Sequence, residues 1–174
     1  IDADAQRSLT NWLEARKKYY REESTGIDSY PFDVRKLDED LKQIKRKYHF
    51  IIIDSPPSIT YDTIQIIKSS DKVFVPVQPS PLDLMATVPF LNLVKQERKK
   101  TTVILNRVMP RAKLTDAMIM RLRYAGAKIA RSRISGKIVY AETFSVGRGV
   151  VDISVTSEAS KEIIKVGNEI LRNF

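Results

Sequence analysis

The sequence contains no cysteine, no long hydrophobic run and few glycines. Without cysteine there is no disulfide, thiolate zinc site, iron–sulfur cluster or cysteine nucleophile. No run approaches the ~20 consecutive apolar residues that a membrane-spanning helix requires. We find no pattern of a secretory signal peptide either. These absences favour a cytoplasmic protein.

The composition is that of a soluble globular chain. The 174 residues are 43% hydrophobic and 29% charged, which is ordinary for a folded domain and unlike a disordered segment. This length is enough for one domain with a sizeable core. We therefore expect a single domain over residues 1–174.

The net charge of +9 is unevenly distributed along the chain. Residues 1–94 carry 13 Lys+Arg and 14 Asp+Glu, whereas residues 95–174 carry 17 and 7. Such an excess favours contact with a polyanion through sequence-independent phosphate contacts. A solubilising surface is the alternative. No helix-turn-helix signature and no interleaved aromatic residues are present. The basic residues of the central stretch are Lys95, Arg98, Lys99, Lys100, Arg107, Arg111, Lys113, Arg121, Arg123, Lys128, Arg131, Arg133, Lys137 and Arg148.

Short apolar runs alternate with helical patterns. The runs are rich in β-branched residues and nearly continuous, as in parallel strands buried on both faces, and they lie at Phe50–Ile53, Lys72–Val75 and Thr102–Leu105. A further strand is predicted at Ala127–Ala130. Helical patterns lie at Ser8–Glu23, Leu37–Ile44, Ile59–Lys68, Leu82–Lys95, Leu114–Arg123 and Ser157–Phe174, and the longest loop is predicted at 24–33. This alternation predicts a three-layer α/β/α fold with a mostly parallel sheet.

Three carboxylates follow predicted strand ends. Asp54 directly follows Phe50–Ile53, and Pro56-Pro57 then forces an extended exit. Ligands of such sheets bind at the carboxyl ends of the strands, where a carboxylate can face Mg²⁺ on phosphates. Asp2 and Asp4 have the spacing of a neighbouring strand end, pointing the same way. The alternatives are that Asp54 caps a loop and that Asp4 or Ser8 caps the first helix.

Together these segments resemble one family of nucleotide-binding proteins. The segments are Asp2-Ala-Asp4-Ala-Gln6, Ile51-Ile-Ile-Asp54-Ser-Pro-Pro57 and Val75-Pro-Val-Gln-Pro79-Ser-Pro81-Leu-Asp83. In order and spacing they resemble the ParA/MinD family of deviant-Walker P-loop ATPases. Within it they are most similar to the short, ParF-like plasmid-partition proteins. The resemblance covers essentially the whole chain.

The resemblance implies ATP and Mg²⁺ as cofactors and assigns roles to individual residues. Asp4 is the switch carboxylate that positions the hydrolytic water, Asp2 supports the Mg²⁺ shell, and Asp54 is the Walker B aspartate. Asn106 and Arg107 resemble the adenine-contacting pair, although Asn106 alone also fits a strand-end turn. The loop from Pro79 to Asp83 borders the base and the dimer interface.

The chain departs from the family pattern in two places. Ala5 stands where the family has proline, which implies a more mobile switch and puts the hydrolysis rate in question more than binding. The glycine-rich phosphate loop is missing, and Gly147-Arg148-Gly149 is too short to replace it. We therefore interpret the sequence as an N-terminally truncated domain that lacks the first strand and the P-loop.

The implied function is ATP-dependent partition of plasmids or chromosomes. The resemblance implies a homodimer that binds double-stranded DNA nonspecifically when it holds ATP, associates with the nucleoid, and has a ParB- or ParG-like centromere-binding partner. The alternative is a noncatalytic relative without a P-loop that binds DNA or acts as an adaptor. Reductase-type relatives need cluster cysteines, which this chain lacks. The terminal helix is better explained by core packing than as a membrane anchor.

Overall fold

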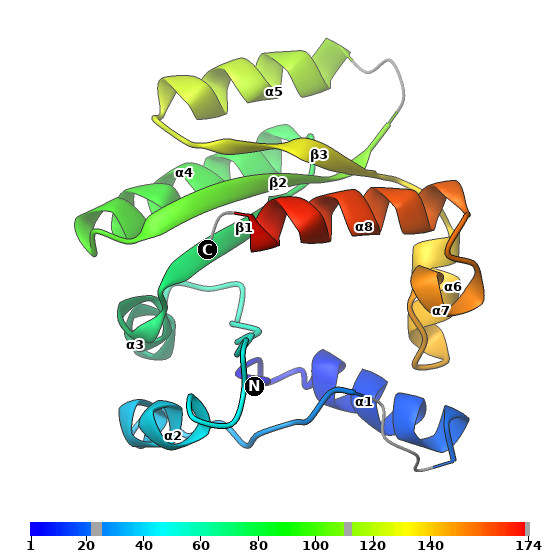
Figure 1. Ribbon diagram of the computed structural model, residues 1–174. Helices are drawn as coiled ribbons and strands as arrows, with labels where there is room; N and C mark the ends of the chain where they lie inside the picture. The colour runs from blue at the N-terminus through cyan, green and yellow to red at the C-terminus, as the bar shows by residue number, and fades with distance from the viewer. Residues whose placement is uncertain (22–25, 110–112, 173–174) are drawn as a thin grey trace. The chain divides into compact units, whose positions relative to one another are not determined.

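A three-stranded parallel sheet forms the centre of residues 71–143 and 149–174 (Figure 1). Its strands lie in the order β1 (Lys72–Val77), β2 (Lys100–Val108) and β3 (Ile129–Ser135), and both neighbouring pairs are parallel. The computed structural model describes residues 1–21, 26–109 and 113–172. It divides into this unit and a second one, residues 1–70 with 144–148, and each is described by itself.

Helices cover both faces of this sheet. Helices α4 (Pro81–Gln96) and α5 (Lys113–Tyr124) pack on one face, and α8 (Glu158–Leu171) packs on the other (Figure 1). Strand β2 is buried on both sides, because Val103 and Leu105 face the α4/α5 layer while Ile104 faces α8. This confirms the predicted three-layer α/β/α arrangement with a parallel sheet.

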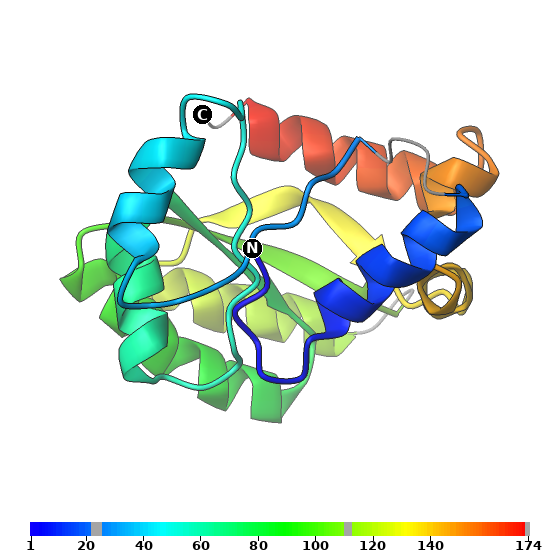
Figure 2. The same cartoon turned by 90° about the horizontal axis from the view of Figure 1, so that it is seen from below.

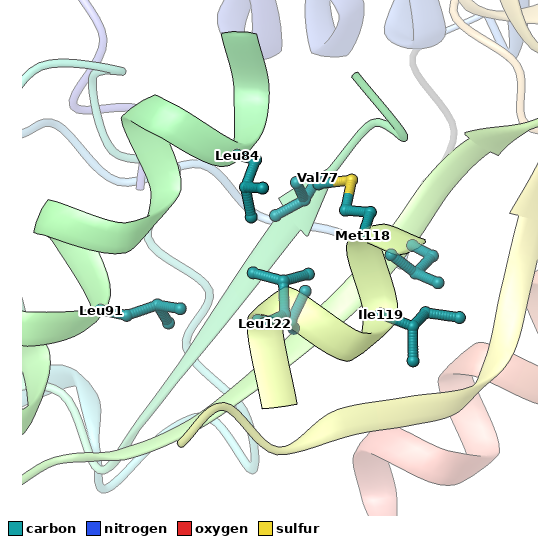
Figure 3. Packing of buried hydrophobic residues seen from close by; sticks show 8 residues of the cluster. Val77, Leu84, Leu91, Met118, Ile119 and Leu122 are labelled. Carbon is teal, nitrogen blue, oxygen red and sulfur yellow. The ribbon is translucent and has the colours of Figure 1, made fainter. Parts of the chain in front are cut away.

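The core between the sheet and the α4/α5 layer is built from aliphatic side chains (Figure 3). Leu122 of α5 and Val103 and Leu105 of β2 are fully buried. Burial of each such side chain contributes about 1.5–3 kcal/mol relative to an exposed position. The complete cluster consists of Val77, Leu84, Leu91, Val103, Leu105, Met118, Ile119 and Leu122.

Carboxylates of α8 bind the backbone of the edge strand β3. Glu169 accepts hydrogen bonds from the backbone N–H groups of Arg131 and Ser132, both at 2.8 Å. Two turns earlier on the same helix, Glu162 accepts a hydrogen bond from the backbone N–H of Ser135 at 2.9 Å. An edge strand otherwise presents unpaired N–H groups. These glutamates therefore hold α8 along β3 and accept hydrogen bonds from the backbone N–H groups of Arg131, Ser132 and Ser135 at the outer edge of the strand.

The sequence patterns located most elements but missed two short helices. The predicted fourth strand is confirmed, although it begins and ends later than expected, as β3. The terminal helix is confirmed as α8, and the last two residues of the prediction lie outside the described residues. Helices α6 (Val139–Ser145) and α7 (Val150–Ile153) were not predicted, because seven and four residues are too few to establish a helical period.

The second unit contains three helices and a small core of its own. The helices are α1 (Ser8–Tyr19), α2 (Leu37–Ile44) and α3 (Tyr61–Ser69). Leu37, Leu41, Ile44 and Ile66 form the buried cluster. The predicted loop is confirmed for residues 26–33, which contain no helix or strand, and its first two residues lie outside the described residues.

The prediction of a strand at Phe50–Ile53 is wrong. Residues 50–53 belong to no strand, and the isolated parallel bridge beside them is made by Asp54, the next residue, with Asp2. Ile51 and Ile53 pack on the α2/α3 core, whereas Phe50 and Ile52 are 54% and 77% exposed. A continuous apolar run predicts burial on both faces, whereas here only the face with Ile51 and Ile53 is covered.

The segment 144–148 packs against α1. Figure 2 shows it, in gold, beside the blue helix. Phe144 stacks on Trp12 with ring centroids 6.3 Å apart, and the Trp12 indole N–H donates to the carbonyl of Arg148 at 3.3 Å. Gly147 adopts a positive φ of 71°, and a Cβ added there would lie 2.5 Å from the carbonyl carbon of Ala15.

Gly147→Ala is therefore expected to destabilise the protein. The added methyl group overlaps the backbone of α1, and the left-handed conformation itself disfavours alanine. The matched control is Gly126→Ala, since Gly126 has a φ of 80° and open space around its Cβ position. We expect Gly147→Ala to lower the free energy of unfolding by about 2 kcal/mol more than the control, measured by urea denaturation. Equal losses would contradict this contact.

Candidate functional site

The structure places Asp2 and Asp54 directly opposite each other. The N–H of Ala3 donates to the carbonyl of Asp54 at 2.8 Å, and the N–H of Asp54 donates to the carbonyl of Ile1 at 2.9 Å. These two bonds run the segments in parallel, so both carboxylates emerge at the same end. The proximity expected from the sequence is therefore present, while the roles assigned to these residues stay predictions.

Asp2 is the residue that caps α1. Its Oδ2 accepts hydrogen bonds from the backbone N–H of Thr10 at 2.8 Å and from the Thr10 hydroxyl at 2.7 Å, and its Oδ1 accepts one from the N–H of Asp4 at 3.2 Å. Burial acts to raise the pKa of Asp2, but the hydrogen bonds from Thr10 outweigh it and the pKa is lowered. The carboxylate is thus held ionised in a fixed orientation.

Neither Asp4 nor Ser8 caps this helix, contrary to the two alternatives considered from the sequence. The residue before the helix is Arg7, with a φ of 54° and no side-chain capping bond. Asp2 reaches the first turn from outside, across eight residues. No local capping pattern has this spacing, which is why the sequence did not reveal Thr10 as a partner.

Asp4 lies in a tight turn that leaves one carboxylate oxygen open. Its Oδ1 accepts a hydrogen bond from the N–H of Gln6 at 3.0 Å, and its carbonyl accepts one from the N–H of Arg7 at 2.9 Å. Within the described residues, no donor reaches the Asp4 Oδ2. The turn therefore orients the side chain while leaving an acceptor for a water molecule or a ligand.

Asp54 is solvent-exposed and electrostatically crowded. Partial desolvation by the surrounding chain, together with the carboxylates of Asp2 and Asp4, raises its pKa above the ordinary value. No hydrogen-bond donor among the described residues satisfies its carboxylate. A cation would relieve this repulsion, so the chemistry of the three acidic side chains fits one.

Asp2, Asp4 and Asp54 do not by themselves form a complete metal-binding site in the part of the chain that the structure describes. Among residues 1–21, 26–109 and 113–172, no group of three or more His, Cys, Asp or Glu side chains is arranged to hold a metal ion. Mg²⁺ usually keeps several waters and takes one or two carboxylates together with substrate phosphates. Asp54 and Asp2 fit that kind of partial coordination and not an all-protein site.

In the sheet unit, the residues that follow β1 and the last residues of β2 lie at the same end of neighbouring strands. Val77 at the end of β1 pairs with Leu105 of β2, so the segment from Pro79 to Asp83 and Asn106 lie at this end. The predicted loop is shorter than expected, because residues 81–83 begin α4, and Asn106 lies inside β2. Both segments are predicted to contact nucleotide. Their proximity follows from the register, and their contacts with a base stay predictions.

Hydrogen bonds within the first of these segments make it rigid. The N–H of Asp83 donates to the Ser80 hydroxyl at 3.1 Å, and Asp83 Oδ2 accepts from the N–H of Gln78 at 2.9 Å. Pro81 occupies the first helical position, where its missing N–H costs nothing. The Ser80 hydroxyl thus caps α4, and the Asp83 carboxylate holds the residues before the helix, a role that the sequence did not reveal.

Asn106 and Arg107 lie within β2, where its pairing with β3 is irregular between Leu105 and Val108, and not in a turn after the strand. Asn106 Oδ1 accepts a hydrogen bond from the N–H of Arg107 at 2.9 Å, and Arg107 has a φ of 53°. The left-handed region is uncommon for arginine and is characteristic of turns with a structural or binding role. The backbone of Arg107 therefore departs from regular strand geometry inside β2.

Among the described residues, no helix is long and apolar enough to cross a membrane. The apolar side of the terminal helix is explained by packing, since Val166 and Ile170 of α8 lie against Ile104 and Ala130 of the sheet. This agrees with the core-packing interpretation of the last helix.

Comparison with known protein families supports the resemblance seen in the sequence. The model of a family described as an AAA domain matches residues 27–107. The maintenance of carboxysome distribution protein A of Halothiobacillus neapolitanus is 27% identical over 98% of this chain and 81% of its own length. The sporulation initiation inhibitor protein Soj of Bacillus subtilis is 26% identical over 79% of this chain and 58% of its own length.

Solved structures show the same fold. The MinD cell division protein of Aquifex aeolicus matches 98% of this chain and 82% of its own with a TM-score of 0.75 at 18% identity. An ATP complex of an Asp-to-Ala variant of McdA from Cyanothece matches 93% of this chain and 62% of its own with a TM-score of 0.67 at 18% identity. In sequence and in fold the chain is therefore similar to the ParA/MinD/McdA family of P-loop ATPases.

Proposed function

We propose that the complete protein is an ATP-dependent partition ATPase that dimerises on ATP and binds double-stranded DNA nonspecifically. The observation that carries the proposal is the pair Asp2 and Asp54 at one end of two parallel segments, with Asp4 two residues along. An oriented carboxylate beside a crowded one is what phosphoryl transfer to water requires on the protein side.

Each acidic residue has a distinct role in this proposal. Asp54 holds the Mg²⁺ of MgATP, directly or through water, and Asp2 stabilises its hydration shell while fixing the start of α1. Asp4 accepts a hydrogen bond from the attacking water through its open oxygen. The metal, when bound, supplies charge neutralisation on the phosphates. A glycine-rich phosphate loop is not among these 174 residues, so hydrolysis requires that a further segment of the complete protein supply it.

The loops of the sheet unit recognise the base and the second protomer in this proposal. Asn106 and Arg107 contact adenine, and the loop from Pro79 to Asp83 borders the base and the dimer interface. Rigidity supports this role, because a loop held by Ser80 and Asp83 loses little conformational entropy when it binds. The narrower likeness to ParF-like proteins remains part of the proposal.

The cargo can be a DNA molecule or a protein assembly. A plasmid or chromosome requires a centromere-binding partner of the ParB or ParG kind, which stimulates hydrolysis and releases the dimer from DNA. The 27% identity to a carboxysome distribution protein over nearly the whole chain favours a second candidate, positioning of a protein-bound compartment on the nucleoid. The ATP cycle is the same in both, so the partner protein distinguishes them.

Nucleotide-dependent DNA binding tests the proposal. The protein with its native N-terminus is titrated with a fluorescent duplex in the presence of MgATP, MgADP or no nucleotide, and anisotropy is measured. We expect MgATP to strengthen binding at least about tenfold over MgADP, because dimerisation doubles the number of phosphate contacts. Equal affinity in all three states would overturn the nucleotide switch.

A thermal melt with nucleotide separates this function from the noncatalytic alternative. Nucleotide that binds only the folded protein raises the melting temperature. An ATPase therefore melts higher in 1 mM MgATP, on the order of several degrees, whereas a DNA-binding or adaptor module without a phosphate site melts at the same temperature.

A further inference from the structure

Three lysines gather where the strands of the sheet begin. Lys72 and Lys100 are the first residues of β1 and β2, and Lys128 immediately precedes β3. Lys72 is paired directly with Lys100 in the parallel register. The carbonyl of Lys128 accepts a hydrogen bond from the N–H of Val103 at 2.8 Å, which ties the third lysine to β2. Lys100 on the central strand thus has one lysine on each neighbouring strand, at the same end of the sheet.

All three lysines lie on the α8 face of the sheet. Two residues after them along their strands come Phe74, Thr102 and Ala130, which line one hollow together with residues of α8. Because side chains alternate between faces with a period of two, the lysines point to the same side. The Lys72 ammonium lies 5.1 Å from the ring centroid of Phe74, in agreement with this direction.

This arrangement costs stability. Burial lowers the pKa of Lys72, and the positive charges of Lys128 and Lys100 lower it further. Like charges directly opposite on neighbouring strands destabilise a sheet. The carbonyls at the end of α8 on this face carry about half a negative charge, which offsets part of the repulsion. A fold selected for stability alone would place neutral polar side chains at these positions, so the cluster points to a binding role.

We propose that Lys72, Lys100 and Lys128 form a contact surface for the phosphate backbone of double-stranded DNA. The inference rests on the DNA binding in the proposed function and gives it a location. The cluster lies at the amino ends of the strands, opposite the end that carries Gln78 and Asn106. DNA bound here leaves the loops at the carboxyl ends accessible.

The geometry fits a duplex. Neighbouring strands are about 4.8 Å apart, so three strands present their charges over about 10 Å. A duplex carries one negative charge per about 1.7 Å of its axis, which matches three closely spaced cations without any sequence readout. Arg172, which follows α8, is exposed and adds a further positive charge to this unit.

A triple substitution tests the surface. Lys72→Gln, Lys100→Gln and Lys128→Gln are combined, and the matched control combines Lys36→Gln, Lys42→Gln and Lys165→Gln, three exposed lysines outside the cluster with the same change in net charge. Binding of the complete, MgATP-loaded protein to a 20-bp duplex is measured from 50 to 300 mM salt. Vesicles containing anionic lipid are titrated in parallel.

We expect the cluster variant to bind DNA at least about tenfold more weakly at 150 mM salt, and its slope of log affinity against log salt to fall by about 2 to 3. The control keeps most of its affinity. Equal losses in both variants, no loss in either, or a loss of vesicle binding alone would overturn the surface. If the wild-type protein does not bind DNA, the proposed function fails as well.

Folding is checked independently of binding. Removing the repulsion should leave the melting temperature unchanged or higher, and the nucleotide-dependent shift in melting temperature should be kept. The single variant Lys100→Gln, at an exposed position, repeats the test if the triple variant does not fold, with an expected decrease in salt slope of about 1. An unchanged slope in that variant would overturn the proposal.

Discussion

Replacing Asp4 with asparagine is expected to lower ATP hydrolysis by the complete protein at least about 100-fold, with little change in ATP affinity. Asparagine keeps an oxygen that can accept the bond from Gln6, so the turn remains, but it loses the basicity needed to orient and deprotonate water. The phosphate release rate and the affinity for a fluorescent ATP analogue measure the two properties separately. ATP-dependent DNA binding should persist and become slow to reverse.

Two further substitutions define the specificity of this effect. Asp54→Asn should lower hydrolysis as strongly but also weaken the dependence on Mg²⁺, because Asp54 is assigned to the metal. Glu14→Gln, on the exposed side of α1, should hydrolyse ATP at the wild-type rate. If Asp4→Asn hydrolyses ATP like Glu14→Gln, then Asp4 does not position the water.

Glu162→Gln is expected to lower the free energy of unfolding at pH 7 by about 2–3 kcal/mol. The Glu162 carboxylate is partly buried and forms an ion pair with Lys137. It also accepts hydrogen bonds from the Ser135 N–H at 2.9 Å and the Tyr140 hydroxyl at 2.8 Å. Burial opposes ionisation, yet these donors outweigh it and lower the pKa of Glu162 to about 2.

The pH dependence follows from the sign of that change. A carboxyl with a pKa near 2 in the folded state and 4.5 in the unfolded state stabilises the protein fully above pH 4.5. The contribution disappears as the pH falls from about 4.5 toward 2, and Glu162→Gln should remove this part of the acid sensitivity. The same carboxylate, together with burial, raises the pKa of Tyr140 above its ordinary value.

Urea denaturation at pH 7, 4 and 3 measures this contribution. Glu158→Gln is the control, since Glu158 lies on the same helix and accepts its hydrogen bond from Lys161 at the solvent-exposed surface. The control should unfold at nearly the wild-type urea concentration at all three values. A Glu162→Gln protein with the same acid sensitivity as wild type would contradict the assigned pKa.

Local sequence patterns correctly predicted the helices and strands that have a regular apolar period or that are covered on both faces. Strands β1 and β2 were recognised because both of their faces are covered, which makes the apolar run continuous. Helix α4 was recognised from a long apolar period, and Ser80 supplies its cap. The acidic pair near the start was correctly expected to lie beside Asp54, since parallel segments present their ends together.

The failures have a common physical cause. The apolar run at Phe50–Ile53 has the pattern of a strand buried on both faces. Whether both faces are covered depends on which segments pack against the run, and the run itself does not show this. Asp2 was assigned to a metal shell alone, yet a hydroxyl eight residues away fixes it in place. Glu162 gave no signal in the sequence, because its partners lie 22 to 27 residues away.

Residue type, local period and order along the chain are enough to predict the resemblance to the ParA/MinD family, the parallel α/β class and the acidic residues of the candidate site. Contacts between residues far apart in the sequence establish which carboxylate caps α1, how the N–H groups at the edge of β3 are hydrogen-bonded, and that Lys72, Lys100 and Lys128 lie together. Consecutive lysines of this set are 28 residues apart, and only the register of the sheet brings their charges to one end.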